Sequence, residues 1–302
     1  MDTFIGSFIA GLAIGAPIFL VASGLVLVFS VMGVLNFAHA GFYLFGAFIF
    51  VTLGSDATGG TTSVGGFIVA VLIAGAIVAG ISVAAERIVF IRTYKRHDHL
   101  AGLMESFALL VLVQGVCELI WGTSALTGQA PSILFGTISI AGVPISKYNV
   151  FLILVATIAA IGLWALVFHT RYGSKIRAVS SDRGMASALG IRVAFVTTSV
   201  FVIGGLLAGI AGAIDAPTVA VDISLLNTFT ISMFAAVILG GFGSILGALV
   251  ASMTLGVLDS LLATYVPSLA GYGLYIAFGV AVLARMYLPA FREIAIGGGG
   301  TI

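Results

Sequence analysis

The segment Arg171–Arg192, RYGSKIRAVSSDRGMASALGIR, is a polar island between two long apolar stretches. It holds five of the twelve Lys and Arg residues of the chain. A segment this polar between membrane-length apolar stretches must lie in water, and its positive charge indicates the cytoplasmic side. Its alanines, together with Met185 and Leu189, predict a short helix that ends at Gly190. We therefore expect an ordered helix at the cytoplasmic face, placed to contact a cytoplasmic partner.

The composition of the chain requires lipid as its solvent. Of 302 residues, 61% are hydrophobic and 8% are charged, whereas soluble domains carry about 25% charged residues. A net charge of +1 gives no indication of nucleic-acid binding. The single cysteine, Cys117, lies in an apolar stretch, so no disulfide or cysteine metal site is expected. No basic region precedes the first apolar stretch, so we expect an uncleaved first span.

Eight apolar stretches are candidates for membrane helices, which need about 20 residues each. They are Phe4–Met32, Phe42–Leu53, Gly66–Phe90, Leu100–Trp121, Tyr148–His169, Ala194–Ile214, Thr228–Thr264 and Ser268–Leu288. The second is short, and the seventh is too long for one helix because the glycines of Gly240–Ser244 interrupt it. The sequence predicts an all-α polytopic membrane protein of eight or nine transmembrane helices, with broken or re-entrant segments.

The basic residues predict the orientation. Arg92, Lys95 and Arg96 follow the third span and Arg171–Arg192 follows the fifth, so both loops should be cytoplasmic and the N-terminus external. Arg285 and Arg292 would place the C-terminal end in the cytoplasm, which requires an odd number of crossings and favours nine. The connections Gly54–Gly65 and Thr123–Lys147 lack a basic cluster and suit the external face. We expect one transmembrane domain over residues 1–292 and a flexible tail over 293–302.

Two interruptions of the apolar pattern are candidates for a translocation path. In Asn36–Gly41, NFAHAG, two polar side chains and a glycine stand between apolar stretches. Polar groups inside a membrane must face protein or water. Asn36, His39 and Gly41 could therefore line a path as a broken helix, or Asn36 and His39 could bond to neighbouring backbone in a packed network. Gly240, Gly241 and Gly243 supply the second interruption, and paired broken helices often mark substrate paths in transporters.

Three acidic residues lie in or near apolar spans and could serve as proton relays. Glu105 and Glu118 lie towards the two ends of their stretch, where each could reach water, and Asp259 is the deepest. Catalytic motifs are missing from the sequence. No lysine follows a glycine, so there is no phosphate-binding loop, and neither His-Glu-x-x-His nor Gly-x-Ser-x-Gly occurs. We expect no metal site, no cofactor and no ATP hydrolysis by this chain.

Four segments in order resemble the LivH-type permeases of branched-chain amino-acid ABC importers. They are Val31–Tyr43 followed by Gly46-Ala47, Glu86-Arg87, Arg171–Ile191, and Ala236–Ile245 followed by Gly247-Ala248. The sequence departs from the family where Ala40-Gly41-Phe42 lacks an acidic residue, and where Tyr287–Phe291 replaces a C-terminal glycine motif. These departures leave the substrate open between branched-chain amino acids and urea, amides or other small acids.

The resemblance implies that the chain forms half of a translocation path. A second, LivM-like permease would complete the path, two cytoplasmic ABC ATPases would drive it, and an extracytoplasmic solute-binding protein would deliver the solute. It also implies a bacterial inner-membrane location, and ATPase coupling through the residues of the polar island, namely Arg177, Asp182, Ala186, Leu189 and Gly190. The alternatives are a self-contained proton-coupled secondary transporter that uses Asp259 or Glu118, and a structural membrane subunit without a path.

Overall fold

The computed structural model describes residues 2–57, 63–90, 99–140, 142–269 and 271–287. Helices make up nearly all of it: α1 Asp2–Met32, α2 Ala38–Ala57, α3 Val64–Ala85, α5 His99–Trp121, α6 Lys147–His169, α7 Arg171–Ser181, α8 Arg183–Ala188, α9 Val193–Asp215, α10 Ser224–Gly240, α11 Ile245–Tyr265 and α12 Gly273–Tyr287. The π-helical turn Glu86–Phe90 extends α3, and two 3-10 turns stand at Ser132–Leu134 and Pro267–Leu269. The predicted all-α polytopic fold is confirmed.

Within the described residues, six helices are long and apolar enough to cross a membrane: α1, α3 with its π-helical extension, α5, α6, α9 and α11. The apolar parts of α2 and α10 are shorter, and α12 has 15 residues. The predicted interruption at Gly240–Ser244 does separate two helices, α10 and α11. The number of crossings, nine by the charge argument, stays a prediction. The expected tail over 293–302 lies outside the described residues.

Helix α1 lies at the centre of the bundle and packs most extensively on α11 and α9. Its 31 residues span roughly 46 Å, more than the ~30 Å hydrocarbon core, and Pro17 lies inside it. Gly11 and Gly15 face the backbone of α11, where a Cβ on Gly15 would lie 2.6 Å from the Ser252 carbonyl oxygen. The close approach of α1 and α11 therefore requires glycine at these two positions, as is typical of small-residue pairs in membrane helices.

The other glycine pair, Gly205 and Gly209 of α9, brings α9 against α3. A Cβ on Gly205 would lie 2.5 Å from Cβ of Ser82, and one on Gly209 would lie 2.8 Å from Cβ of Val78. Ser82 also donates a hydrogen bond to the Phe201 carbonyl at 2.9 Å. Helix α9 thus packs closely on α3 and also on α1 and α2.

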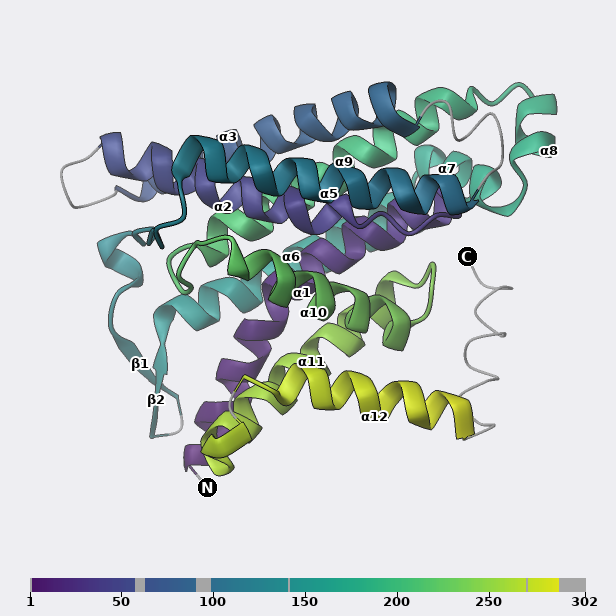
Figure 1. The fold of residues 1–302 in the computed structure, drawn as a ribbon. Helices are drawn as coiled ribbons and strands as arrows, with labels where there is room; N and C mark the ends of the chain where they lie inside the picture. Colours follow the sequence, from purple (N-terminus) through teal and green to yellow (C-terminus); the bar gives the residue numbers. More distant parts are fainter. Residues whose placement is uncertain (1, 58–62, 91–98, 141, 270, 288–302) are drawn as a thin grey trace.

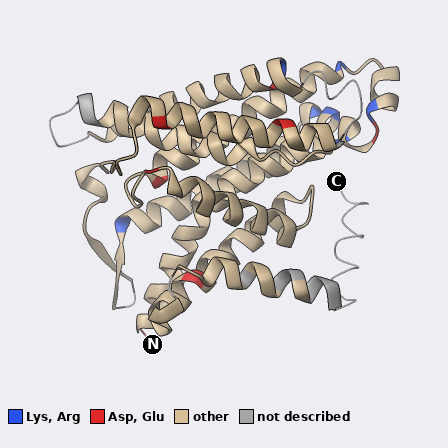
Figure 2. Cartoon of the chain, in the orientation of Figure 1, with Lys and Arg blue, Asp and Glu red and all other residues tan. Residues whose placement is uncertain are grey.

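The basic residues gather at the end of the bundle that carries α7 and α8 (Figures 1 and 2), apart from Lys147 at the start of α6. The one small sheet of the described chain, the antiparallel hairpin β1 Thr137–Ile140 and β2 Val143–Ser146, lies at the opposite end (Figure 1). This separation agrees with a cytoplasmic α7–α8 and an external hairpin. Arg92, Lys95, Arg96 and Arg292, used in the same prediction, lie outside the described residues, as does the side chain of Arg285.

Candidate functional site

The polar island folds into two short helices, where the sequence predicted one. The hydroxyl of Thr170 accepts the Gly173 N–H at 2.9 Å and begins α7. Asp182 then adopts an extended backbone, with φ −152° and ψ 108°, and its carboxylate accepts the Met185 N–H at 2.9 Å. Asp182 therefore ends α7 and caps α8 at once. The predicted helix end at Gly190 is confirmed, since α8 ends at Ala188 and Gly190 follows with φ +82°.

The two helices are anchored on the membrane bundle by an apolar cluster of their own. Ile176 and Val179 of α7 and Ala186 of α8 are buried together with residues from the ends of α1, α6 and α9. The hydroxyl of Ser180 also donates to the Ser30 carbonyl near the end of α1, at 2.6 Å. The segment is thus a structured extension of the bundle.

The outer face of α8 is apolar and exposed. Met185 is 60% exposed and Leu189, just after the helix, is 75% exposed, whereas Ala186 between them in sequence is 2% exposed and anchors the helix. Large apolar side chains on the water-facing end of a membrane protein usually mark a protein contact. Of the residues predicted for ATPase coupling, Leu189 and Asp182 have exposed side chains that a partner could touch.

Arg177 points back towards α6. Its guanidinium donates hydrogen bonds to the Val167 carbonyl and, at 3.5 Å, to the Ser174 hydroxyl, and it lies 5.7 Å from the centre of the Phe168 ring. An arginine at the last carbonyls of a helix satisfies them and offsets the negative end of the helix dipole. Arg177 therefore fastens α7 to the end of α6.

The first predicted break is real and covers residues 33–37, between α1 and α2. Gly33 has φ +71°, and its N–H donates to the Phe29 carbonyl at 2.7 Å, which ends α1. Asn36 is 1% exposed, and its side-chain oxygen accepts the Ala38 N–H at 3.1 Å. Because α2 begins at Ala38, Asn36 lies before the helix and caps it, whereas His39 lies in its first turn.

His39 is enclosed at the crossing of α1, α2 and α9. It is fully buried, between Gly24 and Gly204, with its ring 5.8 Å from that of Phe42. Three buried nitrogens have no hydrogen-bond partner among the described residues: the two ring nitrogens of His39 and the amide nitrogen of Asn36. Gly41 also packs inward, and a Cβ there would lie 2.7 Å from Cγ1 of Val113 on α5. All three residues are enclosed by the chain in this conformation.

The second break is a tight turn between α10 and α11. Gly241 and Gly243 have φ +89° and +91°, and Gly240 packs directly on Gly247. The Ser244 hydroxyl accepts the Gly247 N–H at 3.0 Å and caps α11. A turn with two left-handed residues explains why the sequence needs glycine at 241 and 243.

The structure brings the two breaks together. Phe29, at the end of α1, lies 4.9 Å from Phe242 in the second break, centroid to centroid. The ring of Phe37, in the first break, lies 4.5 Å from the ring of Phe234 on α10, again between centroids. Residues some 200 positions apart in sequence therefore form one irregular region next to the α7–α8 segment.

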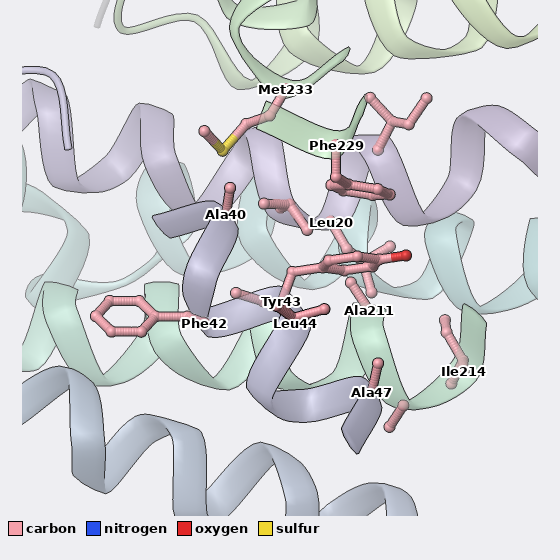
Figure 3. Packing of buried hydrophobic residues seen from close by; sticks show 14 of the residues in the cluster. Leu20, Ala40, Phe42, Tyr43, Leu44, Ala47, Ala211, Ile214, Phe229 and Met233 are labelled. Atoms are coloured by element: carbon pink, nitrogen blue, oxygen red, sulfur yellow. The ribbon is translucent and has the colours of Figure 1, made fainter. Parts of the chain in front are cut away.

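A polar network that the sequence analysis missed lies at the other end of α9. The hydroxyl of Tyr43 donates to the Asp215 carboxylate at 2.7 Å, and the Thr218 hydroxyl donates to it at 2.6 Å. The Tyr43 ring stacks on Phe229 of α10, with centroids 3.6 Å apart, inside the apolar cluster of Figure 3. The sequence did contain a sign of this network, because the acidic residue Asp215 directly follows an apolar span.

The acidic residues considered as proton relays are scattered. Glu118 is exposed near the end of α5, where it accepts from Gln114 at 3.4 Å, and Glu105 is half-buried nearer the start. Asp259 on α11 lies against Gly273 and Leu274 at the start of α12. The described residues contain no group of three His, Cys, Asp or Glu side chains that could hold a metal ion.

An apolar helical bundle with two breaks and a docked polar segment at its basic end defines a polytopic membrane protein. A family model described as branched-chain amino acid transport system, permease component, matches residues 7–285. The chain therefore belongs to this family of permease components.

Two similar permeases match the chain over 95% of its length. The chain is 27% identical over 296 residues to the high-affinity branched-chain amino acid transport system permease protein BraD of Pseudomonas aeruginosa, covering 95% of this chain and 94% of the relative. It is also 27% identical over 299 residues to the permease protein LivH of Escherichia coli K12, with the same coverage. Among solved structures, PsaBC from Streptococcus pneumoniae in complex with Fab matches with a TM-score of 0.47 and 16% identity, over 95% of this chain and 94% of that one.

Proposed function

We propose that this permease imports branched-chain amino acids or a related small polar solute as one half of an ATP-driven transporter. The proposal rests on the family and on relatives named for branched-chain amino acid transport. A second, LivM-like permease would supply the other half, and an extracytoplasmic binding protein would deliver the solute. ATP-dependent uptake of labelled leucine by membrane vesicles with all the subunits tests the substrate, with urea and amides as competitors.

The exposed face of Met185 and Leu189 is the observation that carries ATPase coupling. Two apolar side chains on a helix anchored to α1, α6 and α9 suit insertion into a groove of a cytoplasmic ATPase. ATP hydrolysis would then belong to that partner, because this chain has no phosphate-binding loop.

Charge placed on that face tests the docking. Met185→Glu with Leu189→Glu should remove the ATPase from the purified complex and lower uptake on the order of tenfold or more, as for hot-spot residues. Ser187→Glu is the matched control, because a residue two positions away on a helix does not share that face. If the double variant keeps the ATPase and full uptake, α8 is not the docking element.

The route from docking to the solute path would run through the end of α1. Ser180 of α7 bonds to Ser30, three residues before the first break begins at Gly33, and the second break contacts Phe29. We propose that movement of α7 and α8 shifts both breaks, and that Asn36, His39 and Gly41 face the path in a conformation other than this one. Gly240, Gly241 and Gly243 would allow the matching change at the second break.

A self-contained secondary transporter is not favoured, because the full-length relatives are permease components. Purification in mild detergent tests this point directly. We expect a second permease and ATPase subunits to copurify with the chain. A purified single chain that transports solute alone in liposomes would exclude a half-transporter.

A further inference from the structure

A cavity of about 530 Å³ lies beside the cytoplasmic end of α6, separate from Asn36 and His39. Its walls come from α1, α6, the second break and α11: Phe19, Ala160, Ile161, Trp164, Val167, Phe168, Gly243, Ser244, Ile245, Leu246 and Leu249. The volume falls within the range of about 300–1,000 Å³ typical of ligand sites. The cavity is therefore large enough to hold a ligand.

The chemistry of the walls fits hydrocarbon. Of the eleven lining residues, only Ser244 and Trp164 carry a polar side-chain atom, and the Ser244 hydroxyl is already bonded to the Gly247 N–H. An amino acid or another small polar solute would lose its hydration there without gaining charged partners. A lipid acyl chain has no polar group whose hydration would be lost there.

The rim of the cavity opens on the outer surface of the bundle. Ile161 is 61% exposed and Leu246 is 71% exposed. Exposed apolar residues continue along α6 at helical spacing as Leu154 and Ile158. Trp164 is 53% exposed, with its ring 4.3 Å from that of His169, the last residue of α6. Tryptophan at this level is typical of the membrane–water boundary.

Positive charge stands at the cytoplasmic end of the cavity. The Arg177 guanidinium lies over the ring of Phe168, one of the wall residues. Its hydrogen bonds to Val167 and Ser174 use two of its five N–H donors and leave others for a further acceptor. Arg171 and Lys175 are exposed on the same short helix. Arginine suits phosphate because its donors form a planar fork.

We propose that this cavity binds one anionic phospholipid of the cytoplasmic leaflet, with an acyl chain in the cavity and the phosphate on Arg177 and Arg171. Basic sites between helices on the cytoplasmic side recognise anionic headgroups in this way. The site requires only that the chain lies in a bilayer, so it does not depend on the transported solute. It would couple the α6–α7 junction to the lipid composition of the membrane.

The two tryptophans of the chain, Trp121 and Trp164, allow a direct test. In the full chain with Trp121→Phe, contact of Trp164 with brominated acyl chains quenches its fluorescence. In phosphatidylcholine vesicles, brominated phosphatidylglycerol should quench roughly fivefold more effectively than brominated phosphatidylcholine at equal mole fraction, the factor that one nearby basic residue gives. Trp164→Phe is the matched control, since Trp121 lies at the far end of α5 against Phe48 and should show no preference.

Removal of the basic residues tests the headgroup contact. Arg171→Gln, at an exposed position, should reduce the preference, and Arg171→Gln with Arg177→Gln should abolish it. Equal quenching by the two lipids in the Trp121→Phe protein, or a preference that survives loss of both arginines, would overturn the proposal.

A photoreactive residue at Leu246 distinguishes lipid from protein in the assembled transporter. Irradiation in membranes should give an adduct with the mass of an anionic phospholipid. A cross-link to the second permease instead would show that a subunit covers the cavity, and the lipid site would then be wrong while the half-transporter proposal would stand.

Discussion

The imidazole of His39 lies against the bare backbone of Gly24, so that a Cβ on Gly24 would stand 2.7 Å from Nε2 of His39 and 3.0 Å from the Gly204 carbonyl oxygen. One polar ring thus fills the space where two glycines from α1 and α9 meet. Gly204 is the central residue of α9, which runs from Val193 to Asp215. His39 is therefore placed near the middle of a membrane helix, where its orientation depends on both glycines.

Gly24→Ala should destabilise the protein by about 1–3 kcal/mol, the cost of overpacking a close-packed site. The added methyl group must displace either His39 or the backbone of α9. Thermal inactivation of the purified complex measures the effect. Gly80→Ala is the matched control, because a Cβ there meets nothing within 4 Å and should leave stability unchanged or slightly raised. Equal behaviour of the two variants would mean that α1 and α9 can separate freely.

Tyr43→Phe should destabilise the protein by about 1–3 kcal/mol, the cost of removing a hydrogen-bond partner from a buried polar group. The change keeps the ring stacked on Phe229 but leaves the buried Asp215 carboxylate with one hydroxyl donor fewer. Tyr265→Phe, at a residue 57% exposed, should change stability by less than about 0.5 kcal/mol. A Tyr43→Phe protein as stable as the Tyr265→Phe protein would contradict the assignment of this network.

Asp182→Ala should uncouple ATP hydrolysis from uptake, because loss of the cap costs about 1 kcal/mol in a helix of only six residues. The measurement is ATPase activity and solute uptake in the same proteoliposomes. Asp182→Asn keeps a side-chain oxygen for the Met185 N–H and should restore coupling. If the alanine and asparagine variants both uncouple hydrolysis from uptake, the charge of Asp182 matters and not its cap. Gly190→Val with Asp182→Arg should uncouple more strongly, since valine disfavours φ +82°.

Cysteine labelling separates a path from a packed core at the first break. In a Cys117→Ala background, cysteines at positions 36 and 39 should resist water-soluble thiol reagents in the conformation described here, because Asn36 and His39 are 1% and 0% exposed. The proposed path requires that they react during ATP-driven transport. Cysteine at Ser187, which is exposed and lies off the proposed docking face, is the positive control. Resistance in both resting and ATP-trapped states would assign the break to packing alone.

The sequence by itself determined the features that depend on local chemistry. Continuous apolar stretches of about 20 residues become helices in lipid, because a helix satisfies its backbone hydrogen bonds within the one segment. The glycines of Gly240–Ser244 and Gly190 mark where helices end, and both ends were predicted within a few residues, whereas the break at Asp182 was not. Clustered Arg and Lys predicted the end of the bundle that carries α7 and α8. Each of these depends on neighbours in sequence.

Only the tertiary structure decided which way individual side chains face. The Tyr43–Asp215 hydrogen bond joins residues 172 positions apart, and no local pattern pairs them. Arg177 and Ala186 were predicted to serve coupling together with Leu189, but Arg177 turns to α6 and Ala186 is buried. A helix at an interface has two faces, and its composition does not show which face the bundle covers. The burial of Asn36 and His39 also depends on the tertiary structure. These residues become enclosed only when α1, α2 and α9 cross.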